Sequence, residues 1–102
     1  MPHDPLHSIE RLDPELRENV RRTQDMTFSE GALSRKHKLL TAMALDASLG
    51  AVDGVFSLAR QAQQAGATRP EIMETLRIAR YICGVHAVYI AAPALDRLFP
   101  EE

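Results

Sequence analysis

The chain of 102 residues has no tryptophan, a single cysteine and only 5% aromatic residues. Because aromatic rings are so few, the core has to be built from aliphatic side chains such as Leu, Ile, Val, Ala and Met. One cysteine cannot form a disulfide within the chain, although a bridge between two chains stays open. This cysteine count suits a reducing cytosol, and we expect a cytoplasmic protein.

An excess of positive charge is also missing, because the net charge is -2. The chain therefore offers no basic surface for nucleic acid or for an anionic membrane. No apolar run approaches the ~20 residues that span a bilayer. The polar start at residues 1–5 does not resemble the apolar segment of a signal peptide. We expect one soluble domain over residues 1–102, with neither a membrane nor nucleic acid as a partner.

Helix signals occur along the whole chain, and strand signals are missing. Four candidate N-cap residues start predicted helices: Asp13, Ser34, Asp53 and Thr68. Asp13 is followed by Pro14 at the first helical position, and apolar residues recur at helical spacing in the other three helices. Thr68 is followed by Glu71 at the spacing of a capping box. Glycines predict where segments end: Gly31 marks a turn, the helix after Ser34 ends by Gly50, and Gly66 stops the helix after Asp53.

The two ends of the chain are less regular. Residues 1–12 are expected to be flexible or to add one short helix, Ser8–Leu12. Near the other end, Gly84 bends the chain or separates a last segment, residues 87–99, in which Pro93 predicts a kink or a break. The sequence as a whole predicts an all-α fold of four to five helices.

The segment Ala87–Ala92 carries no charged residue. A helix that is apolar all round is normally buried. Two interpretations stay open: a central helix of the monomer, or a helix at a subunit interface. Small helical domains often complete their core by self-association.

Several short motifs occur in one ungapped frame: the Leu-Ser-x-Lys-x-Lys opening at Leu33–Lys38, the turn at Ala65–Thr68, the Glu-Ile-x-Glu-x-Leu start at Glu71–Leu76, and Tyr81–Val85 followed by Ala87. Together they resemble the carboxymuconolactone decarboxylase family, which includes the AhpD-like alkylhydroperoxidases. The similarity extends over about Asp13–Leu98. The resemblance implies an all-α fold whose subunits interlock as a homotrimer or homohexamer, and it implies no metal or other cofactor.

The same frame shows what this chain has lost. The peroxidase branch of the family uses Cys-x-x-Cys-x-x-x-His and a preceding Glu, and the matching positions here hold Ala51, Gly54, Leu58 and Leu39. None of these side chains transfers a proton or attacks a peroxide, and dithiol chemistry needs two thiols. The dithiol alkylhydroperoxidase mechanism is therefore excluded. The decarboxylase branch also tends to carry a histidine at the position of Leu58, so its proton-transfer group is missing too.

Cys83 and His86 are the remaining catalytic candidates. Three residues apart on a helix, they would share one face, and the histidine could take the thiol proton. The alternative is a buried structural cysteine beside a polar residue at a helix junction. Arg80 and Tyr81, close by in the sequence, are candidate ligand-binding residues, because an arginine can hold a carboxylate with two parallel hydrogen bonds. For Arg80 the alternative is a solvated residue or an ion pair with Glu74 or Asp53.

Other polar residues give weaker signals. Asp46 interrupts an apolar stretch, and we expect it to face solvent or an interface. The cluster Lys36–Lys38 is interpreted as a solvated helix start. The histidines at 3 and 7 are expected to be solvated, and no histidine spacing fits a metal site.

Three functions stay open at this level. The first is a decarboxylase-like protein that binds, with or without transforming it, a small carboxylate or lactone-type ligand near Cys83 and His86. The second is a one-cysteine thiol peroxidase that acts through Cys83. The third is an oligomeric scaffold or partner-binding protein without catalysis.

Overall fold

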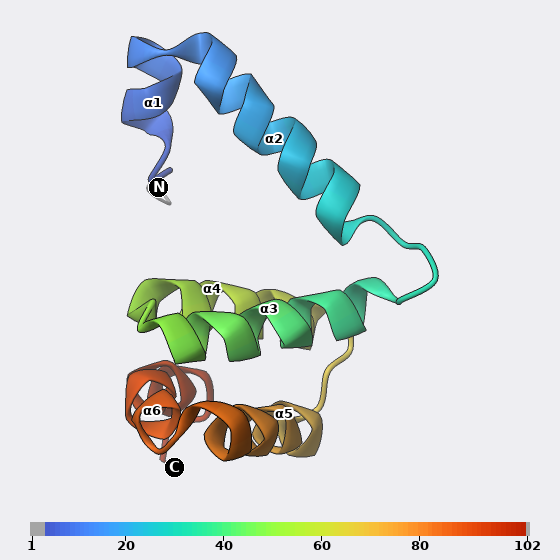
Figure 1. Ribbon diagram of the computed structural model, residues 1–102, viewed down its shortest axis with the longest axis vertical. Coiled ribbons are helices and arrows are strands. Elements are labelled where there is room, and N and C mark those ends of the chain that lie inside the picture. The colour runs from blue at the N-terminus through green and yellow to red at the C-terminus, as the bar shows by residue number, and fades with distance from the viewer. Residues whose placement is uncertain (1–3, 102) are drawn as a thin grey trace.

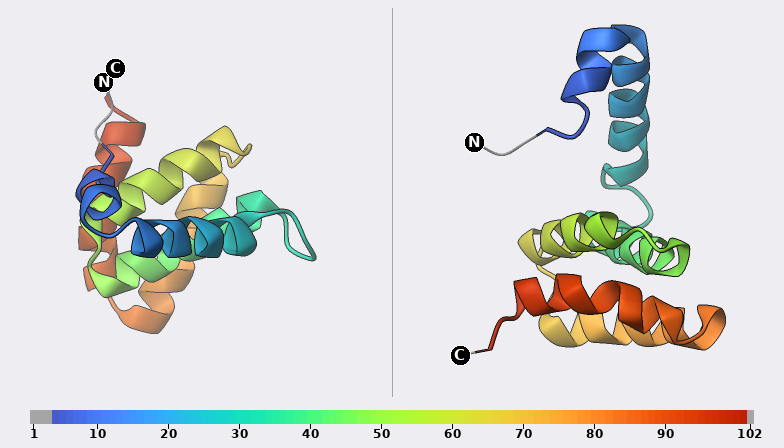
Figure 2. Two further views of the ribbon diagram at one scale, coloured as in Figure 1. Left: turned by 90° about the horizontal axis from the view of Figure 1, so that it is seen from above. Right: turned by 90° about the vertical axis from the view of Figure 1, so that its left-hand side faces the viewer.

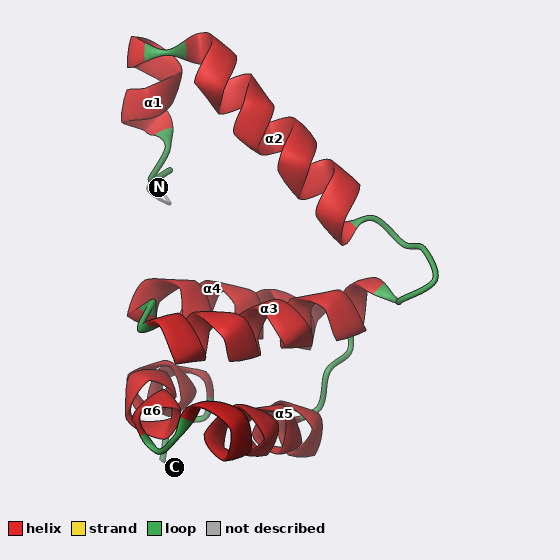
Figure 3. Cartoon of the chain, in the orientation of Figure 1, coloured by secondary structure: helices red, strands yellow, loops and turns green. Residues whose placement is uncertain are grey.

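The computed structural model describes residues 4–101, which form six α-helices and no strand (Figures 1 and 3). The helices are α1 (His7–Leu12), α2 (Pro14–Phe28), α3 (Arg35–Leu49), α4 (Val52–Gln64), α5 (Arg69–Cys83) and α6 (His86–Leu98). The predicted all-α fold is confirmed, but the number of helices in residues 4–101 is six and not the predicted four to five, because the N-terminal residues add the short helix α1. No helix in this described part of the chain combines the length and the apolarity needed to cross a membrane.

Side-chain caps define three of the helix starts, as predicted. The carboxylate of Asp13 accepts from the Leu16 N–H at 3.0 Å, and Ser34 caps α3 in the same way. Thr68 and Glu71 form the complete capping box that opens α5. Each of these caps satisfies an N–H group that has no partner inside its helix.

The predicted cap at Asp53 is wrong. The N-cap of α4 is Ala51, which has no side-chain acceptor, and Asp53 lies within the first turn instead. An acidic residue is still favourable there, because it interacts with the positive end of the helix dipole.

The helix ends follow the glycines. Gly50 has φ +82° and Gly66 has φ +101°, the left-handed region that glycine adopts at low cost. Gly84, with φ +98°, separates α5 from α6. The predicted break at Pro93 is absent, because α6 runs from His86 through Pro93 to Leu98. Pro93 lies on the exposed side of α6, where the carbonyl group that loses its partner can bond to water.

The helices α3 to α6 form a body of two layers, with α3 and α4 in one and α5 and α6 in the other (Figure 1). The predicted aliphatic core is found between these layers. Eight of its fourteen buried residues are alanines; the others are Leu39, Leu40, Met43, Val55, Ile72 and Leu76. Small side chains let the helices approach closely, but each one removes little apolar surface from water.

The helices α1 and α2 form a hairpin, called the arm below (residues 7–28), which stands away from the body (Figure 2). Neither helix contains a buried residue. In the body, α6 is not buried on all sides, because Tyr89 is 74% exposed. The isolated subunit therefore leaves apolar surface uncovered on both the arm and the body.

An ion pair between Lys36 and Glu71 joins α3 to the start of α5, with Nζ and Oε2 2.9 Å apart. The Thr68 backbone N–H, which donates to Glu71, and then Lys36 lower the pKa of Glu71 to about 2. A carboxylate with a lowered pKa in the folded state stabilises the fold above its unfolded-state pKa of about 4.3. That contribution disappears as the pH falls from this value towards about 2.

We therefore predict that Glu71→Gln lowers the free energy of unfolding at pH 7 but has little effect at pH 2. Urea denaturation of both proteins between pH 2 and pH 7 measures the difference. The control is Glu74→Gln, which changes an exposed acid one turn away and should give no comparable pH-dependent difference. A Glu71→Gln effect of the same size at both ends of the range would contradict the prediction.

Candidate functional site

The two positions that the family resemblance aligns with a cysteine pair, Ala51 and Gly54, lie close together at the start of α4. A β-carbon built on Gly54 would be 3.5 Å from the β-carbon of Ala51, a separation found between the two cysteines of a disulfide. The two positions thus keep the geometry of a Cys-x-x-Cys pair without its thiols. Leu39 is 1% exposed, and Leu58 packs against the core cluster. Both of these positions, which the family resemblance aligns with an acid and a histidine, are therefore part of or next to the apolar core.

The carboxylate of Asp46 takes up the space in front of Gly54. A β-carbon at Gly54 would meet the Asp46 Oδ2 atom and lie 2.9 Å from its Cγ atom. The Asp46 side chain is half-buried between α3 and α4, so it is not a fully solvent-facing residue. Its negative charge lies near the N-terminus of α4, which has no side-chain cap of its own.

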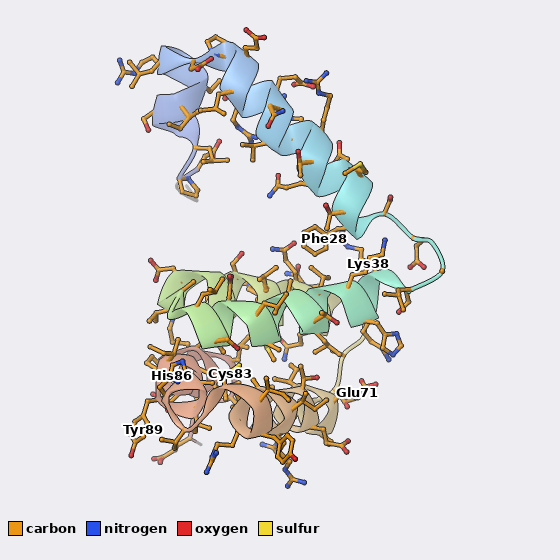
Figure 4. All side chains as sticks on the ribbon, in the orientation of Figure 1. Phe28, Lys38, Glu71, Cys83, His86 and Tyr89 are labelled. Carbon is orange, nitrogen blue, oxygen red and sulfur yellow. The ribbon has the colours of Figure 1, made fainter. Side chains whose placement is uncertain are left out.

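A second polar group is centred on Ser48, near the C-terminus of α3. Its hydroxyl oxygen is 2.9 Å from the Cys83 Sγ atom, and its backbone carbonyl accepts from the His86 Nε2–H at 3.0 Å. The residues Ser48, Cys83 and His86 are called the Ser48 cluster below. Figure 4 shows Cys83 and His86 side by side below the end of α3.

The protons of the Ser48 cluster can be assigned from these bonds. The Ser48 hydroxyl donates its one proton to the Ala44 carbonyl at 2.9 Å. In this arrangement the Cys83 thiol is the donor to the Ser48 oxygen. The His86 Nε2 atom is the donor to the Ser48 carbonyl, which can only accept, and Nδ1 has no hydrogen-bond partner within residues 4–101.

The predicted shared helix face of Cys83 and His86 is wrong. Cys83 is the last residue of α5 and His86 the first of α6, with Gly84 between them. Ser48 connects the two side chains, and no direct hydrogen bond joins them within residues 4–101. Cys83 is half-buried and His86 is exposed.

Comparisons with known proteins agree with the family resemblance. The sequence profile of the carboxymuconolactone decarboxylase family matches residues 14–97. The chain belongs to this family. A carboxymuconolactone decarboxylase family protein from Legionella pneumophila, known from an apo crystal structure, superposes with a TM-score of 0.85. It is 30% identical, and the match covers 94% of this chain and 88% of that one. No curated protein sequence gives a significant match.

The two candidate ligand-binding residues of this family member do not join the Ser48 cluster. Tyr81 is 86% exposed. It follows the buried Leu76 by five residues, and because a helix has 3.6 residues per turn, its side chain lies on the far side of α5 from Leu76. Arg80 is exposed, and in the described part of the chain its side chain has no ion pair with Glu74 or Asp53.

The prediction that the basic cluster Lys36–Lys38 is a solvated helix start is wrong for both lysines. Lys36 pairs with Glu71, and Lys38 Nζ donates to the Ser29 carbonyl at 2.8 Å. Both lysines therefore hold neighbouring segments in place. Of the two N-terminal histidines, His7 is exposed, and position 3 lies outside the described residues.

The larger concave surfaces lie away from the Ser48 cluster. Grooves of about 700 and 460 Å³ adjoin the start of α3, and both are lined by Arg35 and Gln61. Neither groove includes Cys83 or His86. The smaller groove includes Leu58, at the position where the family's peroxidase branch carries its histidine.

The contact of Asp46 with Gly54 predicts a coupled pair of substitutions. Gly54→Ala should destabilise the protein by about 1 to 3 kcal/mol, because the new methyl group displaces the carboxylate. In an Asp46→Ala background the same substitution should cost much less, and chemical denaturation of the four proteins measures this coupling. Equal costs of Gly54→Ala in both backgrounds would contradict the assignment.

Proposed function

We propose that this family member binds a small organic carboxylate or lactone-type ligand at the Ser48 cluster, and acts without dithiol chemistry. The observation that carries the proposal is the arrangement of Ser48, Cys83 and His86. A thiol and an imidazole are held by one serine, and the ring keeps a free Nδ1 acceptor. Exposed apolar residues flank these groups along the chain, as expected for part of a ligand site: Ile82, Val85 and Tyr89.

The cluster has the groups needed for proton transfer. The Ser48 carbonyl orients the imidazole of His86, so that Nδ1 can accept a proton from a bound ligand. The Cys83 thiol, which donates its hydrogen bond to the Ser48 oxygen here, can donate it to an anionic ligand atom instead. Arg80, which has no ion pair in the described chain, would bind the ligand's carboxylate through its guanidinium group. These roles make His86 and Cys83 the proposed catalytic residues.

We further propose that the subunit works as a homo-oligomer, a trimer or a hexamer. Leu49, Ile82 and Tyr89 are each more than 70% exposed, which favours apolar contacts with other copies. A neighbouring subunit would complete a pocket over the Ser48 cluster. Tyr81 lies on the outer side of α5, from where it could reach a ligand that is held between two subunits.

The ligand is expected to raise the melting temperature of the protein. Binding at one hundred times the dissociation constant adds about 2.7 kcal/mol to the stability of the folded state. We predict that a panel of small carboxylates and lactones contains compounds that stabilise the wild-type protein in a concentration-dependent way. Cys83→Ala and His86→Ala should lose this shift in thermal denaturation.

The matched control is His7→Ala, which removes an exposed histidine from the arm and should keep the ligand-induced shift. If no compound in the panel raises the melting temperature of the wild-type protein, the proposed binding function is wrong. The third possibility, a scaffold without a ligand, would then be favoured.

The Ser48–Cys83 hydrogen bond supports a second candidate function, a one-cysteine thiol peroxidase. If the Ser48 hydroxyl turns from the Ala44 carbonyl, it can donate to a Cys83 thiolate instead. The thiolate would attack one oxygen of a hydroperoxide and break the O–O bond, forming a sulfenic acid, and the leaving alkoxide or hydroxide would take a proton from water to become an alcohol or water. Two molecules of an external thiol would then reduce the sulfenic acid, forming a disulfide and water.

Stopped-flow measurement of hydrogen peroxide consumption tests this candidate. We expect a peroxidase to react much faster than a free thiol in solution and to lose this rate in Cys83→Ser. A wild-type rate equal to that of a free thiol, or full activity of Cys83→Ser, excludes the peroxidase function.

A further inference from the structure

The groove of about 700 Å³ at the start of α3 has no role in the function proposed above. Two of the residues that line it, Ser34 and His37, lie one helical turn apart. The Ser34 Oγ atom is 2.6 Å from the His37 Nδ1 atom, which is a short hydrogen bond. The wall of this groove therefore holds a hydroxyl group in direct contact with an imidazole, the combination that activates a serine as a nucleophile.

The Ser34 hydroxyl differs from the hydroxyl groups inside the helices. Those groups donate their proton to the backbone carbonyl four positions earlier: Thr23, Thr41, Ser48 and Thr75. Ser34 instead precedes α3 as its N-cap, and its oxygen accepts the His37 backbone N–H at 3.2 Å. Its own proton is then available to the imidazole, which accepts at Nδ1 when the ring proton is on Nε2. Within residues 4–101, Ser34 is the residue whose hydroxyl contacts an imidazole.

The surroundings of this pair can stabilise negative charge that develops on a substrate oxygen. The backbone N–H groups of Arg35 and Lys36 occupy the first two positions of α3, where no carbonyl of the same helix can accept from them. The Arg35 guanidinium lines the same groove. Its bonds to the Phe28 carbonyl and the Gln61 amide oxygen are both long, at 3.4 Å. These donors can turn to an oxyanion beside Ser34.

We propose that the Ser34–His37 pair is a second reactive site, which hydrolyses small carboxylic esters through an acyl group on Ser34. The pair lies at the opposite end of α3 from the Ser48 cluster. Neither Cys83 nor His86 lines its groove. This activity therefore goes beyond the proposed ligand binding and does not depend on it.

The proposed reaction has two steps. In the first, the Ser34 Oγ atom forms a bond to the ester carbonyl carbon, and its proton passes to His37 Nδ1. The C–O bond to the alcohol then breaks, and the alcohol leaves with the proton from His37. In the second step, water attacks the acyl carbon and gives a proton to His37, and the Ser34 oxygen leaves with that proton. The products are an alcohol and a carboxylic acid, and both side chains return to their starting states.

The first test looks for covalent labelling of Ser34 in the full-length chain. The parent protein carries Cys83→Ser, because a thiol also reacts with activated esters and would obscure the result. An alkyl fluorophosphonate forms a stable bond to an activated serine oxygen while fluoride leaves. Mass spectrometry of the digested protein should find this label on Ser34, and the label should be strongly reduced in His37→Gln.

The second test separates a reactive serine from a helix cap by the rate of p-nitrophenyl acetate hydrolysis. Ser34→Asn keeps a good N-cap residue without a hydroxyl, and its rate should fall to that of the same concentration of free imidazole. Ser34→Thr keeps both the cap and a hydroxyl, and it should retain part of the parent rate. His37→Gln should lower the rate about 100-fold, as expected for the loss of a general base.

The matched controls are His7→Ala and Ser8→Ala, which remove an exposed histidine and an exposed serine from the arm and should keep the parent rate. Circular dichroism and thermal denaturation check that Ser34→Asn keeps its helix content and stability. The labelling experiment uses the parent protein, so its result does not depend on how any Ser34 variant folds.

The outcomes decide between a reactive Ser34 and a purely structural one. If Ser34 of the parent protein takes up no fluorophosphonate, or if Ser34→Asn hydrolyses the ester at the parent rate, Ser34 acts only as a helix cap and the proposal is wrong. Ligand-induced stabilisation at the Ser48 cluster is measured separately, so the failure of one proposal is distinguishable from the failure of the other.

Discussion

The rest of the structure depends on α3, because every other part of the body and the arm is held to it. Its core-facing side packs against α4, α5 and α6, and Lys36 ties it to the capping box of α5. Lys38 holds the base of the arm, and Ser48 holds the Ser48 cluster. One fifteen-residue helix thus sets the positions of the core, the arm and the candidate site.

The core explains why one subunit leaves so much surface uncovered. Alanines such as Ala47 and Ala59 bring the helices close together, but they contribute little to the hydrophobic driving force. The remaining large aliphatic residues are divided between the core and the outer surface, where Leu45, Leu49 and Ile82 lie. The composition is consistent with a subunit that gains part of its stability from association.

The parts of the fold that follow from local interactions could be predicted from the sequence. The caps at Asp13, Ser34 and Thr68 each bond to a backbone group three residues along the chain, so their pattern is visible in the sequence. The start of α4 was assigned to the wrong residue, because an acid in the first turn resembles a cap. The effect of Pro93 depends on the exposure of its side of α6, which only the packing decides.

The candidate site was predictable only in part, for a related reason. Cys83 and His86 were found because a lone thiol near a histidine is conspicuous in any sequence. Ser48 was missed, because it contacts residues 35 and 38 positions away, and a serine near a helix end carries no signal of its own. The close approach of Asp46 to Gly54 was hidden in the same way, since it joins two helices across a turn.

That approach of Asp46 to Gly54 has an evolutionary consequence. A chain with cysteines at positions 51 and 54 would have to move or shorten the side chain of Asp46. A cysteine at Gly54 alone would place its β-carbon against this carboxylate and disturb the packing between α3 and α4. The residues at positions 46 and 54 are therefore expected to change together, because the side chain at one position sets the space at the other.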